Sequence, residues 1–320
     1  MTIRVAITGI SGDVGLGAIC GLQAGRDAGN DIWLLGLDAA DDCPGRQLVD
    51  AFARLPPVAD PKYLEALAAQ LRAHTIDVLL PGIDSEIMLL SRHRDRIANS
   101  GTQIALAPAD LIEAADDKLA TAAFVASRGL SAPATCDADD PQDLGFPVVA
   151  KPRRGQGSRG VLILDNAQSL TAFLDERSPF YCLQRYIEGP EITVGFLYDW
   201  NGTLRDAIAM ERSLEGGRTI RATVTRSPEI LRFIEEFGAK IRGAGAVNAQ
   251  LRIDRNAGPQ IFEINARLSG STAMRVAVGF NDPLRIVMHL ARGIPIERAT
   301  VYDATVQRVS SELVVKRSGE

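Results

Sequence analysis

One stretch of this chain, residues 260–267, reads Gln260-Ile261-Phe262-Glu263-Ile264-Asn265-Ala266-Arg267. It is typical of a buried strand that ends in an acid, an amide and a guanidinium on alternate residues. Successive strand side chains point to opposite faces, so Glu263, Asn265 and Arg267 are expected to converge. Carboxylate and amide oxygens suit a hard cation such as Mg²⁺, and an arginine beside them can hold charge on a transferring phosphoryl group. The pattern also fits a strand end whose polar edge faces water.

The bulk composition is that of an ordinary globular protein. A length of 320 residues predicts about two domains with sizeable cores. Hydrophobic residues make up 46% of the chain and charged residues 23%, which is a usual balance. A net charge of -5 and an aromatic content of 5% argue against nucleic-acid binding.

Cysteine and histidine give no sign of a metal centre. The four cysteines and three histidines lack metal-type spacing, so reduced thiols are expected. The longest apolar runs are far shorter than a membrane span, and the strand-like start at residues 1–7 leaves no room for a signal peptide. We therefore expect a cytoplasmic protein with neither nucleic acid nor membrane as a partner.

The first third of the chain alternates strands and helices. Apolar strand-like runs at 3–8, 31–38 and 76–81 are separated by helical patterns, which predicts a parallel sheet with helices on both faces. A domain boundary is expected near residues 108–116. The other elements expected before it are helices through about residue 24, at 61–74 and at 85–97, and a short strand at 103–106.

The remaining chain is richer in strands. The turn at 254–259 joins strands at 246–253 and 260–265, which should bring Gln250 beside Glu263 and Asn265. The other elements expected here are strands at 145–152, 161–164, 181–187, 191–198, 204–212 and 218–225, and helices at 110–129, 169–175 and 228–242.

A first glycine-rich loop follows the first strand. Gly9, Gly12 and Gly15 stand where a backbone can approach a phosphate, and Asp38 ends the next strand, where it could accept from a ribose hydroxyl. A nicotinamide enzyme of the short-chain type would also need a tyrosine followed four residues later by a lysine, which none of the five tyrosines has. A tight structural turn is therefore the favoured interpretation.

A second loop, residues 151–161, contains a lysine, three arginines, a serine and three glycines. Glycines let successive N–H groups surround an anion, and the basic side chains neutralise its charge. Lys151 leaves the end of an apolar strand, which should hold its ammonium beside the loop. We interpret the loop as a phosphate-binding lid; the alternative is a flexible surface turn.

The order of these motifs resembles the ATP-grasp superfamily, and within it the carbamoyl phosphate synthase and biotin carboxylase branch. The resemblance implies an α/β fold in which a Rossmann-like pre-ATP-grasp domain, 1–112, precedes a two-lobed α+β ATP-grasp domain, 113–320. The lid-bearing small lobe would span 113–187, and the large lobe with the metal site would span 188–320. Many relatives are dimers, so a homodimer is compatible with the resemblance.

The same resemblance implies roles for residues. Lysines would reach the ATP phosphates, the lid would cover them, a hinge at 184–187 would read the adenine edge, and Glu191 would accept from the ribose. Gln250, Glu263 and Asn265 would hold Mg²⁺, with two ions expected and Mn²⁺ as a substitute, and Arg267 would contact the reacting phosphoryl. The implied nucleotide-binding residues are Lys118, Lys151, Gly155, Gly157, Ser158, Arg159, Gly160, Gln184, Arg185, Tyr186, Ile187 and Glu191.

The substrate site is less clear from the sequence. Arg221 or Arg218 could hold a substrate carboxylate, with Arg221 the preferred catalytic candidate and a surface arginine the alternative. Asp84 and Glu86 follow a strand end, where they could bind a substrate amine or mark the start of a helix. The small residues after Arg267 that could line the site are Ser269, Gly270 and Ser271.

These features favour an ATP-dependent ligase that converts a small carboxylate to an acyl phosphate and joins it to an amine, with amino-acid-like substrates. The protein would act by positioning and charge neutralisation, which fits the lack of a nucleophile–base pair. Two alternatives remain open: a carbamate or carboxylate kinase of the carbamoyl phosphate synthase type, and a nucleotide-binding regulatory module with little turnover.

Overall fold

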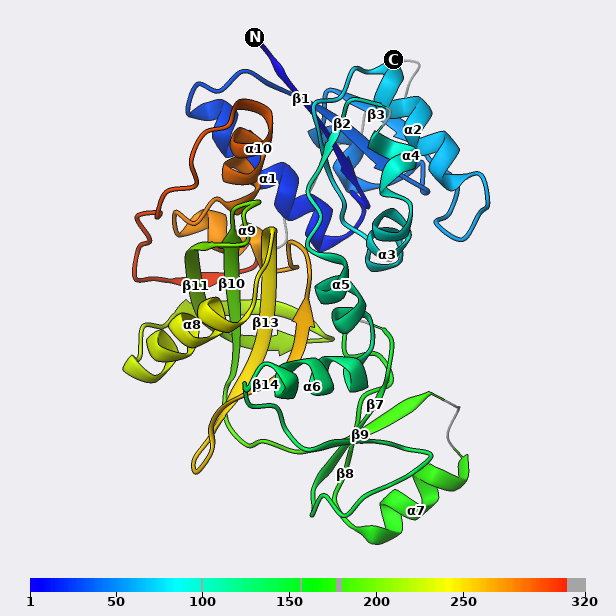
Figure 1. Ribbon diagram of the computed structural model, residues 1–320, viewed down its shortest axis with the longest axis vertical. Helices are drawn as coiled ribbons and strands as arrows, with labels where there is room; N and C mark the ends of the chain where they lie inside the picture. The colour runs from blue at the N-terminus through cyan, green and yellow to red at the C-terminus, as the bar shows by residue number, and fades with distance from the viewer. Residues whose placement is uncertain (99, 156, 177–179, 310–320) are drawn as a thin grey trace.

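The computed structural model describes residues 1–98, 100–155, 157–176 and 180–309. Gln156 of the glycine-rich loop lies outside these ranges. The described chain forms three sheets, and the first lies at one end of the molecule with the smallest at the other (Figure 1). The prediction of a parallel α/β part followed by an α+β part is confirmed, and both later sheets are antiparallel.

The first sheet is parallel, with the order β3-β2-β1-β4-β5. Its central strands consist almost entirely of apolar residues because helices cover both faces, and Val5, Ala6 and Ile7 are buried. The strands are β1 Ile3–Thr8, β2 Ile32–Asp38, β3 Ala51–Arg54, β4 Val78–Leu80 and β5 Gln103–Ile104. The helices connecting them are α1 Asp13–Asp27, η1 Pro44–Leu48, α2 Tyr63–Ala73, α3 Asp84–Arg92 and α4 Arg94–Ala98.

Several predicted boundaries in this half were wrong. The sequence did not indicate β3, and the helix expected at 85–97 is interrupted at His93. The helix expected at 110–129 is two helices, α5 Ala109–Asp116 and α6 Lys118–Ser127. Asp117 separates them because it adopts an extended backbone and its carboxylate accepts from the Leu119 N–H as the N-cap of α6.

The second sheet has the order β14-β13-β10-β11-β12-β15, and the third has the order β6-β9-β7-β8. The second sheet comprises β10 Glu191–Tyr198, β11 Leu204–Glu215, β12 Arg218–Val224, β13 Gly245–Asp254, β14 Gly258–Asn265 and β15 Thr305–Gln307. The third comprises β6 Thr135–Asp137, β7 Val148–Pro152, β8 Leu162–Leu164 and β9 Tyr181–Arg185. The remaining helices are α7 Ala167–Glu176, α8 Pro228–Lys240, α9 Thr272–Ala277 and α10 Asp282–Arg292.

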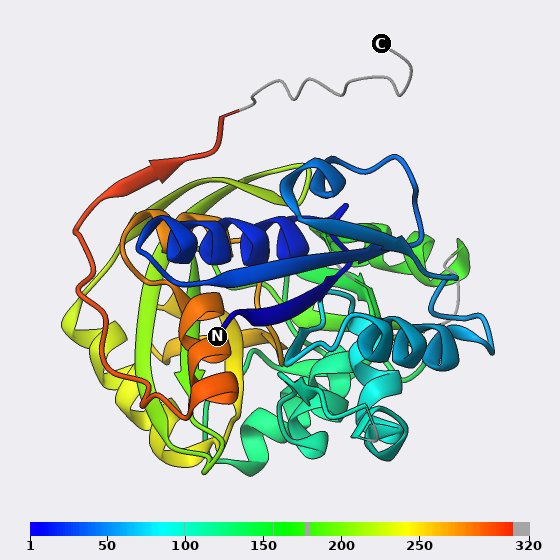
Figure 2. The same cartoon turned by 90° about the horizontal axis from the view of Figure 1, so that it is seen from above.

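Helix α1 joins the N-terminal sheet to the C-terminal helices α9 and α10, which lie beside it (Figures 1 and 2). Three glycines, Gly17, Gly21 and Gly25, recur every four residues and form one face of α1. A Cβ at any of them would come within 3.0 Å of an atom of Thr272, Asn281 or Leu284. The bare glycine face therefore lets the two halves of the chain approach closely.

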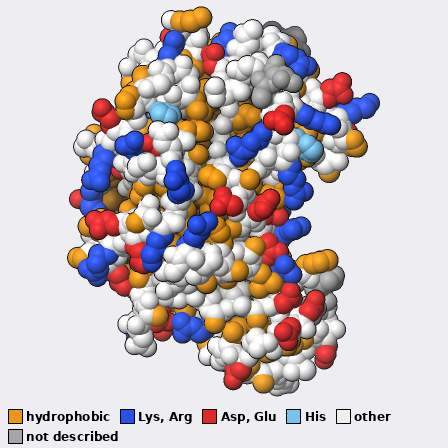
Figure 3. Space-filling model, in the orientation of Figure 1, with side chains coloured by type: hydrophobic (Ala, Val, Ile, Leu, Met, Phe, Trp, Pro, Cys, Tyr) orange, Lys and Arg blue, Asp and Glu red, His pale blue; other side chains and the backbone are white. Residues whose placement is uncertain are grey.

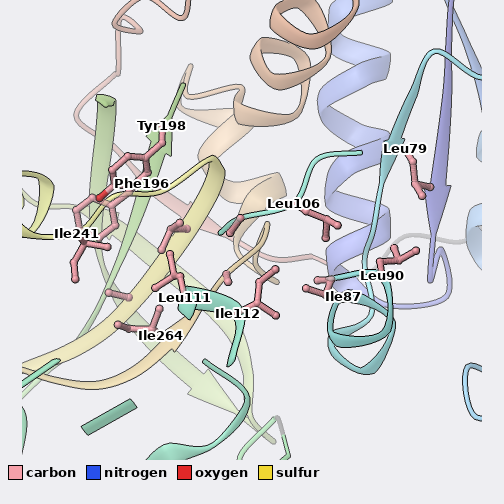
Figure 4. Packing of buried hydrophobic residues seen from close by; sticks show 14 of the residues in the cluster. Leu79, Ile87, Leu90, Leu106, Leu111, Ile112, Phe196, Tyr198, Ile241 and Ile264 are labelled. Carbon is pink, nitrogen blue, oxygen red and sulfur yellow. The ribbon is translucent and has the colours of Figure 1, made fainter. Parts of the chain in front are cut away.

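Buried apolar residues connect the halves as well. Leu79, Ile87 and Leu90 of the N-terminal part and Ile112 of α5 belong to one cluster with Ile264 of β14 (Figure 4). This continuous packing holds the end of β14 close to the carboxyl edge of the parallel sheet. Among the helices of the described ranges, none is both long and apolar enough to cross a bilayer.

Candidate active site

The acid, amide and guanidinium at the end of β14 lie together. Gln250 pairs with Glu263 across the β13–β14 ladder, and its Nε2 lies 3.4 Å from Glu263 Oε1. The Asn265 Nδ2 donates to the same Oε1 at 2.9 Å, and the Arg267 Nη2 donates to Asn265 Oδ1 at 3.2 Å. One carboxylate and two amides give oxygen donors that fit Mg²⁺ held chiefly by substrate phosphates.

Arg267 is held by the N-terminal part of the chain. Its buried guanidinium forms a two-point ion pair with Asp84 in the first turn of α3, and its Nη1 donates to the Leu268 carbonyl at 2.9 Å. Asp84 is therefore not a free acceptor for an amine in this arrangement. It also does not cap α3, whose N-cap is Ile83.

Three cavities meet at Glu263. The first, about 520 Å³, lies against the carboxyl edge of the parallel sheet; the second, about 250 Å³, lies beside β7 and β9; the third, about 480 Å³, lies beside α3 and α5. Glu263 lines all three, and Asn265 and Arg267 line the first and third. Basic and acidic side chains lie side by side in the middle of the molecule, above the lobe of the third sheet (Figure 3).

The second cavity collects most of the residues predicted to bind a nucleotide. Val149, Ile163 and Phe262 contribute apolar surface to its lining. The predicted residues that line it are Lys118, Lys151, Gly155, Gly157, Ser158, Arg159, Gln184, Arg185, Tyr186, Ile187 and Glu191. Gly160 does not line it, and a Cβ there would lie 2.8 Å from the Tyr181 hydroxyl.

Lys151 is buried at the end of β7, between the third sheet and the second sheet. Its Nζ donates to Gln184 Oε1 at 2.7 Å and to the Phe262 carbonyl at 3.3 Å. Burial lowers the pKa of Lys151 to about 8, although the negative charge of Glu263 opposes the shift. The ammonium is thus desolvated and poorly compensated before any anion arrives.

The glycine-rich loop approaches the turn between β11 and β12. Gly155, Gly157 and Ser158 have positive φ, which lets the loop curve over the cavity. The loop is joined to α6 because the Lys118 Nζ donates to the Gly155 carbonyl at 3.1 Å. A Cβ at Gly217 would lie only 2.1 Å from the Gly157 carbonyl oxygen, so this contact requires glycine on the β11–β12 turn.

We expect Gly217→Ala to push the loop away from the cavity. For the ATP-dependent turnover expected from the sequence, we predict a kcat/KM reduced by up to about 100-fold, since misplacing positioning groups by about 1 Å can have that effect. Gly216→Ala is the matched control: its φ is also positive, but a Cβ there meets no atom within 4 Å. Equal kinetic losses in the two variants would show that backbone strain, not the loop contact, is responsible.

The sequence selected the wrong arginine on β11–β12. Arg221 is exposed, its backbone pairs with Gln307 of β15, and it lines none of the cavities described above. Arg212 of β11 instead lines the first and second cavities and donates to Glu191 Oε1 through Nε at 2.9 Å. An alternation count along β12 could not show that Arg221 faces away from the cavities, because the β11–β12 register shifts between Ser213 and Leu214.

The segment after Arg267 supplies part of the first cavity. Ser269 and Gly270 line it, whereas Ser271 is buried behind it, with its Oγ 3.2 Å from Thr219 Oγ1. Arg275 holds this segment from beneath: it donates to Ser269 Oγ at 2.8 Å and forms a fully buried ion pair with Asp282 at 2.7 Å. The hydroxyls therefore have fixed positions.

The predicted substrate residue Glu86 is also misplaced. It is fully buried beneath the first cavity and does not line it. The Tyr63 hydroxyl donates to Glu86 Oε1 at 2.6 Å, and the Thr8 hydroxyl donates to its other oxygen. A glutamate on the inward face of a helix looks like a surface acid in the sequence, so its burial could not be predicted.

The first glycine-rich loop forms a tight turn, as favoured from the sequence. Gly9 has a φ of 64°, and a Cβ at Gly15 would lie 2.4 Å from the Gly9 carbonyl oxygen. Asp38 accepts from the Ser11 N–H at 2.8 Å and closes the turn. The turn lines one side of the first cavity, at the strand-order reversal where open α/β sheets bind ligands.

Two family models match the chain. A model described as ATP-grasp in the biosynthetic pathway with Ter operon matches residues 177–312, and a PylC-like N-terminal domain model matches residues 24–105.

Curated relatives match shorter segments. A D-alanine–D-alanine ligase from Corynebacterium urealyticum is 28% identical over 144 residues, which cover 38% of this chain and 40% of the relative. A carbamoyl-phosphate synthase from Methanobrevibacter smithii is 24% identical over 155 residues, which cover 45% and 42%. The matched segments thus span less than half the length of these relatives.

The fold is similar to that of solved structures. An N5-carboxyaminoimidazole synthetase from Staphylococcus aureus complexed with ADP superposes with a TM-score of 0.74 at 17% identity. The superposition covers 93% of this chain and 80% of that one.

Proposed function

Because this chain belongs to the ATP-grasp superfamily, we propose that it is a ligase that uses ATP to activate a small carboxylate as an acyl phosphate and joins it to an amine. The observation that carries this proposal is the meeting of three cavities at Glu263. A ligase of this class brings together three molecules, ATP, a carboxylate and an amine, at one reaction centre. A kinase or a nucleotide sensor needs fewer sites.

We assign the second cavity to ATP. Its apolar walls suit a purine, Lys151 and Lys118 would neutralise the phosphates, and Glu191 would accept from the ribose. Gln250, Glu263 and Asn265 would hold Mg²⁺, which when bound neutralises phosphate charge. Lys151, desolvated in the free protein, would gain a compensating anion on ATP binding.

We assign the first cavity to the amine-bearing substrate. At about 520 Å³ it is within the size range of pockets that hold substrate-sized molecules. Arg212 and Arg267, which line it at the reaction-centre end, would hold the charge that develops on the acyl phosphate. The loop at residues 157–159 would close over both cavities and exclude water from the acyl phosphate.

The affinity for ATP should fall at high pH. Only the protonated Lys151 attracts phosphate, and the pKa of Lys151 in the free protein is about 8. Above that pH we expect the Kd for ATP to rise by up to about tenfold per pH unit, until the pH reaches the pKa of Lys151 in the ATP complex. Titration calorimetry from pH 7 to 10 measures this; a flat profile would show that Lys151 does not contact the phosphates.

The test of the ligase proposal does not require the acceptor to be known. Hydroxylamine traps acyl phosphates as hydroxamates, so each of the twenty L-amino acids is incubated with Mg²⁺-ATP, hydroxylamine and the protein. Hydroxamate and ADP formed in equal amounts, and lost in Glu263→Ala, are the expected result; pairs of amino acids without hydroxylamine then identify the acceptor. ADP formed with a released phosphorylated product would instead indicate the kinase, and ATP binding without turnover would indicate the regulatory module.

A further inference from the structure

A buried carboxyl group lies directly beneath the proposed amine cavity. Glu86 of α3 is fully buried, and the two hydroxyls that donate to it come from different elements, Thr8 at the end of β1 and Tyr63 at the start of α2. Both of these residues line the first cavity. Thr8 and Tyr63 therefore lie between the hidden carboxyl and the cavity.

The groups that bond to Glu86 are neutral. Besides the hydroxyls of Thr8 and Tyr63, they are the backbone N–H groups of Gly82 and Ile83. Burial outweighs these hydrogen bonds and raises the pKa of Glu86 to about 7, so the carboxyl can exchange a proton near neutrality. Burial and the charge of Glu86 raise the pKa of Tyr63, with a smaller contribution from Asp38, so the phenol keeps its proton.

A ligase of this class needs a proton acceptor at this place. An amine arrives in neutral solution as an ammonium, which has no lone pair to attack an acyl phosphate. The acids that line the first cavity are Asp13, Asp38 and Glu263. Burial raises the pKa of Asp13, but the hydrogen bond from Arg218 and the charge of Arg308 outweigh burial and hold this pKa below its usual value. Asp38 accepts from two backbone N–H groups, and Glu263 belongs to the proposed metal set.

We propose that Glu86 takes the proton of the incoming ammonium through the hydroxyl of Tyr63. The ammonium gives a proton to the phenol oxygen as the phenol passes its own proton to the Glu86 carboxylate. The step yields a neutral amine, an intact phenol and a carboxylic acid, and Glu86 later returns the proton along the same path. Thr8, which also accepts from the Gly82 N–H at 3.0 Å, holds the second carboxylate oxygen in place. This inference rests on the ligase function proposed above.

The test compares two nucleophiles that differ in their need for a base. Hydroxylamine is mostly unprotonated at neutral pH, whereas methylamine and the acceptor identified by the pair screen are protonated. In Glu86→Gln and Tyr63→Phe, we expect the ratio of amine-dependent to hydroxylamine-dependent turnover to fall by about 100-fold or more, the range for a general base. Glu65→Gln, an exposed glutamate on α2, is the matched control and should keep the wild-type ratio.

The pH profile separates the relay from mere structural support. Amine-dependent turnover of the wild type should increase as the pH is raised through about 7, and Glu86→Gln should lack this increase. Equal losses with both nucleophiles and an unchanged profile would overturn the relay and leave the ligase intact. A wild type that forms no hydroxamate would remove the ligase proposal and the relay with it.

Protein stability provides a check that needs no substrate. The pKa of Glu86 in the folded state, about 7, is raised above 4.5, so the folded protein holds an extra proton between these pH values. Its stability should therefore fall as the pH rises from 4.5 to 7, and Glu86→Gln should lack this contribution. The measurement is the thermal-unfolding midpoint of the wild type and of Glu86→Gln at several pH values between 4.5 and 7. If the two midpoints changed with pH in the same way, Glu86 would not titrate in this range, and the relay would be overturned.

Discussion

Replacing Glu263 by glutamine is expected to lower Mg²⁺-dependent ADP formation by about 100- to 1,000-fold, the loss typical when one preorganised electrostatic group is removed from a reaction centre. Glu263 is the one carboxylate of the proposed metal set. Its Oε1 accepts hydrogen bonds from the side-chain amides of Gln250 and Asn265. Glutamine keeps the size of the side chain and one acceptor oxygen, but it removes the charge and replaces the other oxygen by an NH₂ donor. The fold should persist while affinity for the cation falls.

The measurement is steady-state ADP release at increasing Mg²⁺ and Mn²⁺ concentrations. Partial recovery at high metal concentration would identify the loss as one of metal affinity. Glu235→Gln, on the exposed face of α8, is the matched control and should behave as the wild type. If Glu263→Gln retained full activity at low Mg²⁺, the proposed metal site would be wrong.

Replacing Lys151 by methionine is expected to weaken ATP binding by about 2–5 kcal/mol, the usual loss when one partner of a buried charge pair is truncated. That corresponds to a Kd roughly 30- to 4,000-fold higher. Methionine fills the same apolar channel beside Phe262, and removing a desolvated charge offsets the lost hydrogen bond to Gln184. We therefore expect little change in the free energy of unfolding.

Calorimetric titration with ATP and urea unfolding together test this prediction. Lys62→Met is the control, because Lys62 is exposed at the start of α2. Unchanged ATP affinity in Lys151→Met would place the nucleotide elsewhere. A dinucleotide at the Gly9 turn, the alternative considered from the sequence, would bind Lys151→Met as tightly as the wild type.

Much of the site was predictable because its signals are local. The alternation of Glu263, Asn265 and Arg267 on a strand implies a shared face, and the short turn after Asp254 sets the partner strand that carries Gln250. The glycines and basic residues after Lys151 indicated the loop in the same way. Each inference needed only the geometry of one strand or one hairpin.

The errors came where an answer depended on segments far apart in the chain. Arg212 of β11, not Arg221 of β12, lines the cavities, and the register shift between these two strands leaves no mark in an alternation pattern. Asp84 looked free until the packing of α3 and α5 brought it to Arg267, 183 residues away.

The sequence by itself thus determined the parallel sheet, the cluster at the end of β14 and the resemblance to the ATP-grasp superfamily, since strand periodicity and hairpin turns act over a few residues. Only the tertiary structure decided that three cavities meet at Glu263 and that Glu86 lies beneath one of them. The physical reason is burial. Whether a carboxyl faces water or the interior depends on what the rest of the chain packs against it, and that packing changes its proton affinity and its chemistry.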